Sequence, residues 1–385
     1  MPRSLVLPFA FAALAAGCGP ASDGLGTAED AVSSSAVDPG NAGGNKFVTV
    51  MTRNLYIGGA VEPFFEPGVT TSQIPGLAAI LWATVQATDF PERAVAIADE
   101  IAETGPDLVG LQEVALWRTQ FPGDSYLATG VPATEVAYDF LKILVDELRD
   151  RGLSYSAVTV RENIDVEAFT VPGFMDVRLT DRDAILARDD VMVEGTDGAT
   201  FIASIAVPLG GAGGPEVSVV RGWTSARVKV QGVELVFANT HLEPFSPIIQ
   251  GFQAAELFGV FAGETRPVVL VGDFNSRPGP ASDPNTATYR LFTGSGYVDT
   301  FGAVNPGVDG FTCCQAPDLA NPVSLLDERV DHLFLKGALA PRAASLVGED
   351  PDDRIGGLWP SDHAGVVGSV RLEDPRFVGL TAPAR

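Results

Sequence analysis

Short apolar runs alternate with polar and turn-forming residues along most of the chain. Runs rich in β-branched and aromatic residues predict strands, and they lie at residues 47–51, 108–111, 156–160, 184–187, 228–230, 233–238, 268–271, 330–335 and 366–370. Apolar residues at helical spacing predict three helices. One follows Pro91, whose fixed φ suits a first turn. Another covers residues 137–148 and ends before Gly152, and the third runs from residue 247 to about 262 and ends at Gly263.

The order of these elements predicts a mixed α/β sandwich. Strands and helices alternate in the first half of the chain, whereas residues 156–238 are almost entirely strand-like and imply antiparallel neighbours. The segment 58–90 interrupts this order with more large apolar side chains than a loop requires. It is either a lid or apolar wall beside a site, or a surface subdomain that packs on the core. The second interpretation is favoured because apolar clusters usually belong to the core.

The first residues are typical of a secretory signal. Arg3 precedes an apolar run over residues 5–16, and Gly17-Cys18 follows, so we expect a signal peptide over residues 1–17. Cys18 stands where a bacterial lipoprotein carries its lipid; the alternative is simple secretion after cleavage. Residues 18–45 hold few large apolar side chains and predict a flexible tether. We therefore expect a protein exported to the cell envelope and anchored to the membrane through Cys18, or otherwise secreted.

Net charge and cysteine content bear on the kind of ligand and on the presence of a disulfide. The net charge of −24 opposes long-range attraction to duplex DNA or an acidic membrane surface, although bound divalent cations can reverse the sign locally. Cys313 and Cys314 are adjacent, and in an oxidising compartment they either form a vicinal disulfide or remain two buried thiols. No obligate protein partner is evident, and we expect a monomer.

Polar residues with catalytic chemistry follow several of the predicted strands. A hard cation such as Mg²⁺ takes oxygen ligands from carboxylates and amides, and hydrolysis of a phosphate ester requires a charge of this kind beside the phosphoryl oxygens. Groups that could converge at strand ends in this way are Asn54, Glu113, Asp273, Asn275 and Asp362.

Seven short motifs, in this order, resemble the endonuclease/exonuclease/phosphatase superfamily. They are Arg53-Asn54-Leu55, Leu111-Gln112-Glu113, Arg182-Asp183-Ala184-Ile185-Leu186, Asn239-Thr240-His241-Leu242, Gly272-Asp273-Phe274-Asn275, Arg329-Val330-Asp331-His332 and Ser361-Asp362-His363. The resemblance spans residues 46–372 and leaves 373–385 as a C-terminal tail. It implies a four-layer α/β sandwich in which two packed, mixed but mainly antiparallel β-sheets are flanked by helices.

The resemblance also implies roles for individual residues. Glu113 is similar to the principal carboxylate ligand of the cation, and Asn54 and Asp362 are similar to further groups of the metal site. The cation would be Mg²⁺, or Mn²⁺ or Ca²⁺. Asp273 resembles the residue that orients or deprotonates the attacking water, and Asn275 resembles the amide beside it that holds the phosphate.

The three histidines divide into two groups. His241 and His363 resemble the pair that faces the scissile phosphate, and Asp331 resembles the aspartate that fixes a histidine ring. His332 points to the opposite face of its strand from Asp331 by strand alternation, so we interpret it as structural.

Two charged residues have open roles. Arg221 could bind a phosphate oxygen with its planar guanidinium or anchor a surface carboxylate. Asp183 stands where many relatives of the superfamily have a small or amide residue, and a salt link to a neighbouring arginine is the default interpretation.

Two functions remain at this point. The first is a metal-dependent phosphoric ester hydrolase acting on nucleic acid or on a phospholipid- or sphingomyelin-like substrate by in-line attack of water. The alternative is a catalytically silent envelope binding protein that retains the fold.

Overall fold

The computed structural model describes residues 46–127, 129–209, 214 and 216–372 of the 385-residue chain. The predicted signal peptide, the tether with Cys18 and the C-terminal tail lie outside the described residues. Among the helices of the described part, none has the length and apolar character needed to cross a bilayer.

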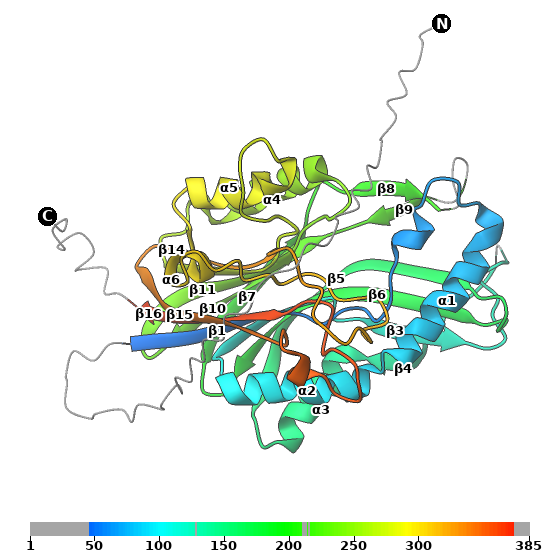
Figure 1. The fold of residues 1–385 in the computed structure, drawn as a ribbon, viewed down its shortest axis with the longest axis horizontal. Helices are drawn as coiled ribbons and strands as arrows, with labels where there is room; N and C mark the ends of the chain where they lie inside the picture. Colours follow the sequence, from blue (N-terminus) through cyan, green and yellow to red (C-terminus); the bar gives the residue numbers. More distant parts are fainter. Residues whose placement is uncertain (1–45, 128, 210–213, 215, 373–385) are drawn as a thin grey trace, which may run out of the picture. The chain divides into compact units, whose positions relative to one another are not determined.

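The first β-sheet has eight strands (Figure 1). Seven follow the order β15-β16-β1-β2-β6-β3-β4, and β5 also pairs with β6. Only β1 and β2 run parallel; the other pairs are antiparallel. The strands are β1 (Lys46–Asn54), β2 (Leu108–Gln112), β3 (Leu116–Gln120), β4 (Glu135–Asp139), β5 (Tyr155–Phe169), β6 (Asp176–Arg188), β15 (Leu339–Val347) and β16 (Gly365–Leu372).

The second sheet has six strands in the order β13-β14-β12-β11-β10-β7. Again one pair, β11 and β12, is parallel. Its strands are β7 (Met192–Thr200), β10 (Gly222–Val230), β11 (Val233–His241), β12 (Val268–Asp273), β13 (Val298–Asp299) and β14 (Asp331–Lys336). A separate two-stranded sheet consists of β8 (Ile205–Pro208) and β9 (Glu216–Val219).

Helices cover the outer faces of both sheets. The α-helices are α1 (Ile74–Ala87), α2 (Phe90–Thr104), α3 (Phe140–Asp150), α4 (Pro247–Ala262), α5 (Ala287–Gly294) and α6 (Thr300–Val304). Short 3₁₀ helices are η1 (Glu62–Phe64), η2 (Thr71–Gln73), η3 (Pro284–Thr286) and η4 (Pro351–Asp353). The predicted third helix matches α4, where Ser246 Oγ accepts a hydrogen bond from Ile249 N at 3.3 Å and Pro247 begins the helix.

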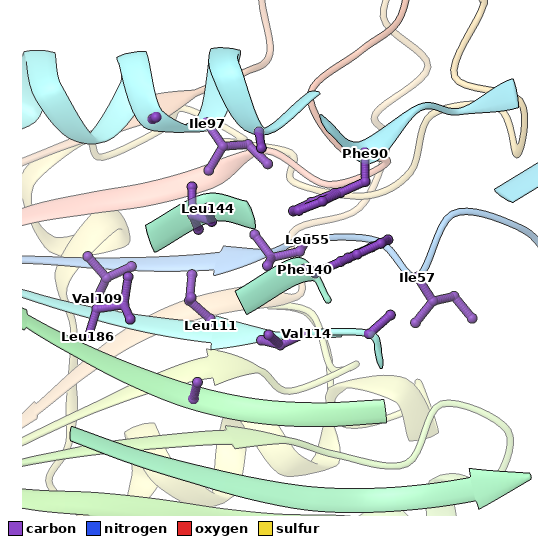
Figure 2. Close-up of a cluster of buried hydrophobic side chains, with 14 of the residues drawn as sticks. Leu55, Ile57, Phe90, Ile97, Val109, Leu111, Val114, Phe140, Leu144 and Leu186 are labelled. Atoms are coloured by element: carbon purple, nitrogen blue, oxygen red, sulfur yellow. The ribbon is translucent and has the colours of Figure 1, made fainter. Parts of the chain in front are cut away.

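Three apolar cores separate the layers. Val50 of β1 and Phe237 of β11 belong to the core between the two sheets. Leu111 of β2 packs with Ile97 and Leu144 on the helical side of the first sheet (Figure 2). A third core lies between the second sheet and helices α4 and α5. The architecture is thus helix, sheet, sheet, helix, which is the four-layer sandwich that was expected.

One asparagine joins the two sheets at their interface. Asn239 of β11 donates from Nδ2 to Leu111 O at 2.8 Å and to Ala184 O at 3.0 Å, and it accepts from Gln112 Nε2 at 2.6 Å. A Cβ on Gly110 would lie 2.9 Å from Asn239 Oδ1 and 2.5 Å from Val271 Cγ2. The glycine therefore leaves room for a fully buried polar link between the sheets.

One helix boundary differs from the prediction. The helix over 137–148 begins only at Phe140, because Ala137 lies in β4, which pairs with β3. Asp139 ends the strand and caps the helix, its side chain accepting from Lys142 N at 3.4 Å. Ala137 fits the helical spacing of apolar residues although it lies in a strand, so the predicted helix began about one turn too early.

The segment 58–90 forms η1, η2 and α1. Trp82, Val85 and Phe90 are buried in the core on the helical side of the first sheet. Phe64 and Leu81 instead line a cavity. The segment therefore packs on the core and also forms an apolar wall.

Candidate active site

The predicted site residues lie at one edge of the sandwich because of strand direction. β1 and β2 run parallel, as do β11 and β12, so each pair ends at the same edge. β14 is antiparallel to β12, so Asp331 at its start pairs with Asp273 at the end of β12. The side chains of Asn54 and Asp273 then join the two sheets through a hydrogen bond of 3.2 Å.

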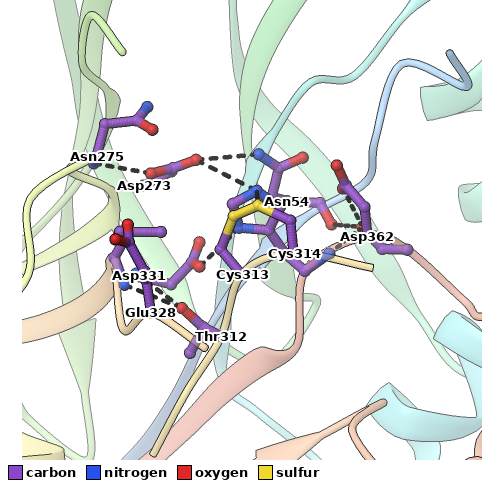
Figure 3. Close-up of a disulfide and its surroundings, with 12 residues drawn as sticks. Asn54, Asp273, Asn275, Thr312, Cys313, Cys314, Glu328, Asp331 and Asp362 are labelled. Atoms are coloured by element: carbon purple, nitrogen blue, oxygen red, sulfur yellow. Dashed lines mark hydrogen bonds and ion pairs between the residues drawn. A yellow bond between two sulfur atoms is a disulfide. The ribbon is translucent and has the colours of Figure 1, made fainter. Parts of the chain in front are cut away.

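Asp273 lies at the centre of this cluster and is almost fully buried. Its Oδ1 accepts from Asn275 N at 2.9 Å, and its Oδ2 accepts from Asn54 Nδ2 (Figure 3). The Nε2 atoms of His241 and His363 lie 3.6 Å and 3.8 Å from the same Oδ2. Burial, reinforced by the charge of Asp331, raises the pKa of Asp273 to about 7, so this carboxyl is close in pKa to a general base for neutral pH.

The two imidazoles have different charges. Burial lowers the pKa of His241 well below its usual value, and the charge of Arg221 lowers it further. Arg221 Nη1 lies 3.0 Å from His241 Nδ1. Because a guanidinium only donates, Nδ1 accepts and the proton of neutral His241 sits on Nε2, which faces Asp273.

His363 has the opposite environment. Burial lowers its pKa, but the charges of Asp331, Asp362 and Asp273 together outweigh burial and raise the pKa well above its usual value. Its Nδ1 donates to Asp331 Oδ2 at 2.8 Å. Asp331 therefore fixes the ring, and the cationic form keeps a proton on Nε2, which points toward Asp273.

Glu113 is held just beyond the end of β2 in a left-handed conformation, with φ of 54°. Its Oε2 accepts from Ile57 N at 2.8 Å and its Oε1 from Asn54 Nδ2 at 3.3 Å. Burial, together with the charge of Asp181, raises the pKa of Glu113. Burial and the charge of Glu113 likewise raise the pKa of Asp362 to about 7, despite the opposing effect of His363.

This set of donors fits a hard divalent cation. Burial disfavours the negative charges of Glu113 and Asp362, so a cation beside these carboxylates would relieve the repulsion. Asn54 lies next to Glu113, to which its Nδ2 donates, and its Oδ1 accepts from Tyr56 N at 2.9 Å. Within the described residues, Asp273, Asp331 and His363 also bring potential ligand atoms within 4.8 Å of one another.

Cys313, Cys314 and His363 form a second such group, but Cys313 and Cys314 are joined in a disulfide (Figure 3). Of the two alternatives left open by the sequence, the structure has the disulfide. Cys314 Sγ lies 3.8 Å from His363 Nε2. Because metals bind thiolates, this disulfide supplies no metal ligand.

Arg221 and Asp183, whose roles the sequence left open, both have defined hydrogen-bond partners. Arg221 pairs with the buried carboxylate of Asp181 at 3.3 Å rather than with a surface group. Asp183 is fully buried and accepts from Asn163 Nδ2 at 3.0 Å, and no ion pair to an arginine is found for it in the described part of the chain. Asp181 was not among the residues predicted from the sequence. It lies two residues before Asp183 on β6, so both side chains lie on the same face of the strand.

Asn275 and His332 have well-defined positions. Asn275 Nδ2 donates to Leu242 O at 2.9 Å, so its amide also holds the loop after β11. His332 Nε2 lies 2.8 Å from Ser276 O, and its ring packs against Phe274. His332 is thus directed away from His363 and into the core, as strand alternation predicts.

Comparison with known proteins identifies a family and a fold that agree with this arrangement of residues. Residues 80–363 match a family model described as the endonuclease/exonuclease/phosphatase family. The fold is similar to family proteins from Bacteroides thetaiotaomicron (16% identity, 86% of this chain and 100% of that chain, TM-score 0.53) and Beutenbergia cavernae (22%, 86% and 72%, 0.52). These likenesses show the fold alone. No curated protein matches the chain in sequence.

Proposed function

Because this chain belongs to the endonuclease/exonuclease/phosphatase family, whose members are typically phosphoester hydrolases, we propose that it hydrolyses phosphoric monoesters or diesters with a divalent cation. One observation carries the proposal. The Nε2 atoms of His241 and His363, which come from distant parts of the chain, lie 3.6 Å and 3.8 Å from a single oxygen of Asp273. The two imidazoles can donate protons or hydrogen bonds, and the buried carboxylate of Asp273 beside them can accept a proton.

The residues that would hold the cation are Glu113, Asn54 and Asp362. Mg²⁺, Mn²⁺ or Ca²⁺ bound there supplies positive charge that offsets the charge of the phosphoryl oxygens. All three come from strand ends of the first sheet: Asn54 ends β1, Glu113 follows β2 and Asp362 precedes β16.

The chain's own groups can carry the proton transfers. Asp273 accepts a proton from water while the water oxygen forms a bond to phosphorus and the P–O bond to the leaving group breaks. His363, protonated and held by Asp331, donates a proton to the leaving oxygen. His241 donates a hydrogen bond from Nε2 to a phosphoryl oxygen, and Arg221 fixes the tautomer that makes this possible.

The test is hydrolysis of bis-p-nitrophenyl phosphate with Mg²⁺, Mn²⁺ or Ca²⁺, with and without a chelator. We expect His363→Ala and Asp273→Asn to lower turnover by about two orders of magnitude or more. For Asp273→Asn we expect little change in melting temperature, because the amide keeps the volume of a carboxyl group whose charge burial and Asp331 already disfavour. Asp309→Asn is a matched control, since Asp309 is exposed. Absence of chelator-sensitive turnover on esters, DNA, RNA and sphingomyelin would refute the proposal.

We further propose that the mature protein is exported and carries a lipid on Cys18. The charged start, the apolar run and the small residues before Cys18 support this. The intact mass of the protein purified from membranes checks it. A mature mass that begins after Cys18, or that lacks acyl groups, would contradict the anchor.

A further inference from the structure

A cavity of about 150 Å³ lies beside the candidate site. Its walls come from the segment before and along α1, from β5 and β6, and from β9. Most of the side chains that line it are apolar, among them Ile57, Phe64, Leu81, Trp117, Val166 and Leu179. The charged residues on its wall are Glu113, Glu167, Asp181 and Arg221.

The cavity borders the site, because three of these charged residues, Glu113, Asp181 and Arg221, line the cavity and also contact site residues or belong to the site. Glu113 Oε2 accepts from the backbone of Ile57, which itself lines the cavity. Arg221 Nη1 contacts both Asp181 and His241. One molecule can therefore have a phosphoryl group beside His241 and a second group among the apolar side chains.

We infer that this cavity binds the aliphatic group of an amphiphilic phosphoric ester, an inference that rests on the proposed function and names its substrate class. An apolar cavity of roughly this volume can bind a molecule the size of benzene, so about six carbon atoms fit. The hydroxyl groups of a sugar or nucleoside would lose hydrogen bonds to water among these side chains, which disfavours them. The net charge of −24 also disfavours a polyanionic nucleic acid.

The first experiment measures the affinity of monoalkyl phosphates of one to eight carbons for the full chain with Mg²⁺. Intrinsic tryptophan fluorescence reports binding, because one of the four tryptophans, Trp117, lines the cavity. We expect the Kd to fall about threefold to fourfold for each added methylene up to about six carbons, the change that corresponds to about 0.8 kcal/mol per buried CH₂, and then to level off. A Kd independent of chain length would overturn the inference.

A matched pair of variants on β5 locates the effect. Ala168 lines the cavity, so Ala168→Phe should fill it and remove the dependence on chain length while methyl phosphate still binds. Ala157 is exposed on the same strand, and Ala157→Phe should retain the dependence. If both variants retain it, the aliphatic group binds elsewhere and the inference is wrong.

Release of inorganic phosphate from the same compounds separates the two proposals. Chain-length-dependent binding without any release, from these or from diesters, would support the apolar cavity and refute the hydrolase. Release of inorganic phosphate, together with equal affinity for methyl and hexyl phosphate, would support the proposed hydrolysis. It would refute the binding of an aliphatic group in the cavity. Both release and a rising affinity would support both.

Discussion

Protonation of His332 should destabilise the protein below neutral pH. The ring is almost fully buried, its Nε2 donates to Ser276 O at 2.8 Å, and its Nδ1 has no hydrogen-bond partner among the described residues. Burial lowers the pKa of His332 from 6.5 to about 4, and the charge of Arg329 contributes to the decrease. A second proton would therefore create a buried charge and a donor without an acceptor.

The direction of the change in unfolding free energy depends on whether the folded or the unfolded chain binds more protons at His332. Between pH 6.5 and about 4 the unfolded chain binds a proton at His332 that the folded chain does not, so the free energy of unfolding falls as pH falls through this window. Above pH 6.5 His332 is neutral in both the folded and the unfolded chain, so protonation of this residue does not lower the free energy of unfolding. At about 1.4 kcal/mol per pH unit, the whole window corresponds to roughly 3 kcal/mol.

The assay is urea unfolding of the wild type and of His332→Gln at pH 7 and pH 4.5. Glutamine can donate to Ser276 O but does not titrate, so any packing loss is the same at both pH values. We expect the wild-type advantage over the variant to shrink by roughly 2–3 kcal/mol at the lower pH. Parallel loss of stability in both proteins would refute the assignment of this pH dependence to His332.

Three further predictions concern the site and its support. Glu113→Gln should raise the metal concentration that gives half-maximal turnover, and an unchanged requirement in a metal titration would remove Glu113 from the ligands. Asp331→Asn should lower turnover by about tenfold to a hundredfold because His363 loses a charged hydrogen-bond partner; steady-state kinetics at saturating metal check this, and wild-type turnover would contradict it. Arg53→Met should cost about 3–5 kcal/mol of unfolding free energy because Glu100 is left buried without its bidentate partner. Addition of Glu100→Leu should recover much of that loss in urea unfolding, and a double variant no more stable than the single one would argue against the ion pair.

The layered fold and the convergence of strand ends could be predicted from the sequence. Apolar runs of strand length and a set of ordered motifs identify which polar residues end each strand, and strand direction then brings Asn54 and Asp273 together. The local pattern indicated which residues end their strands, and the resemblance to the superfamily implied that these ends converge.

Other features depend on contacts that no local pattern encodes. Asp181 lies in the middle of β6, and its importance comes from Arg221, 40 residues away. The cavity requires residues from α1, β5 and β9 to leave space between them. The choice between thiols and a disulfide at Cys313 and Cys314 likewise depends on the three-dimensional structure.

The buried amide of Asn239 suggests how catalytic and structural effects could be separated. It is fully buried and links the sheet that carries Glu113 to the sheet that carries Asp273. Leucine there would be nearly isosteric, but it would leave Leu111 O, Ala184 O and Gln112 Nε2 without this partner, at about 1–3 kcal/mol for each buried group left unpaired. A substitution beneath the site should therefore lower stability and displace Glu113 from Asp273 together, which distinguishes it from a substitution of Asp273 itself.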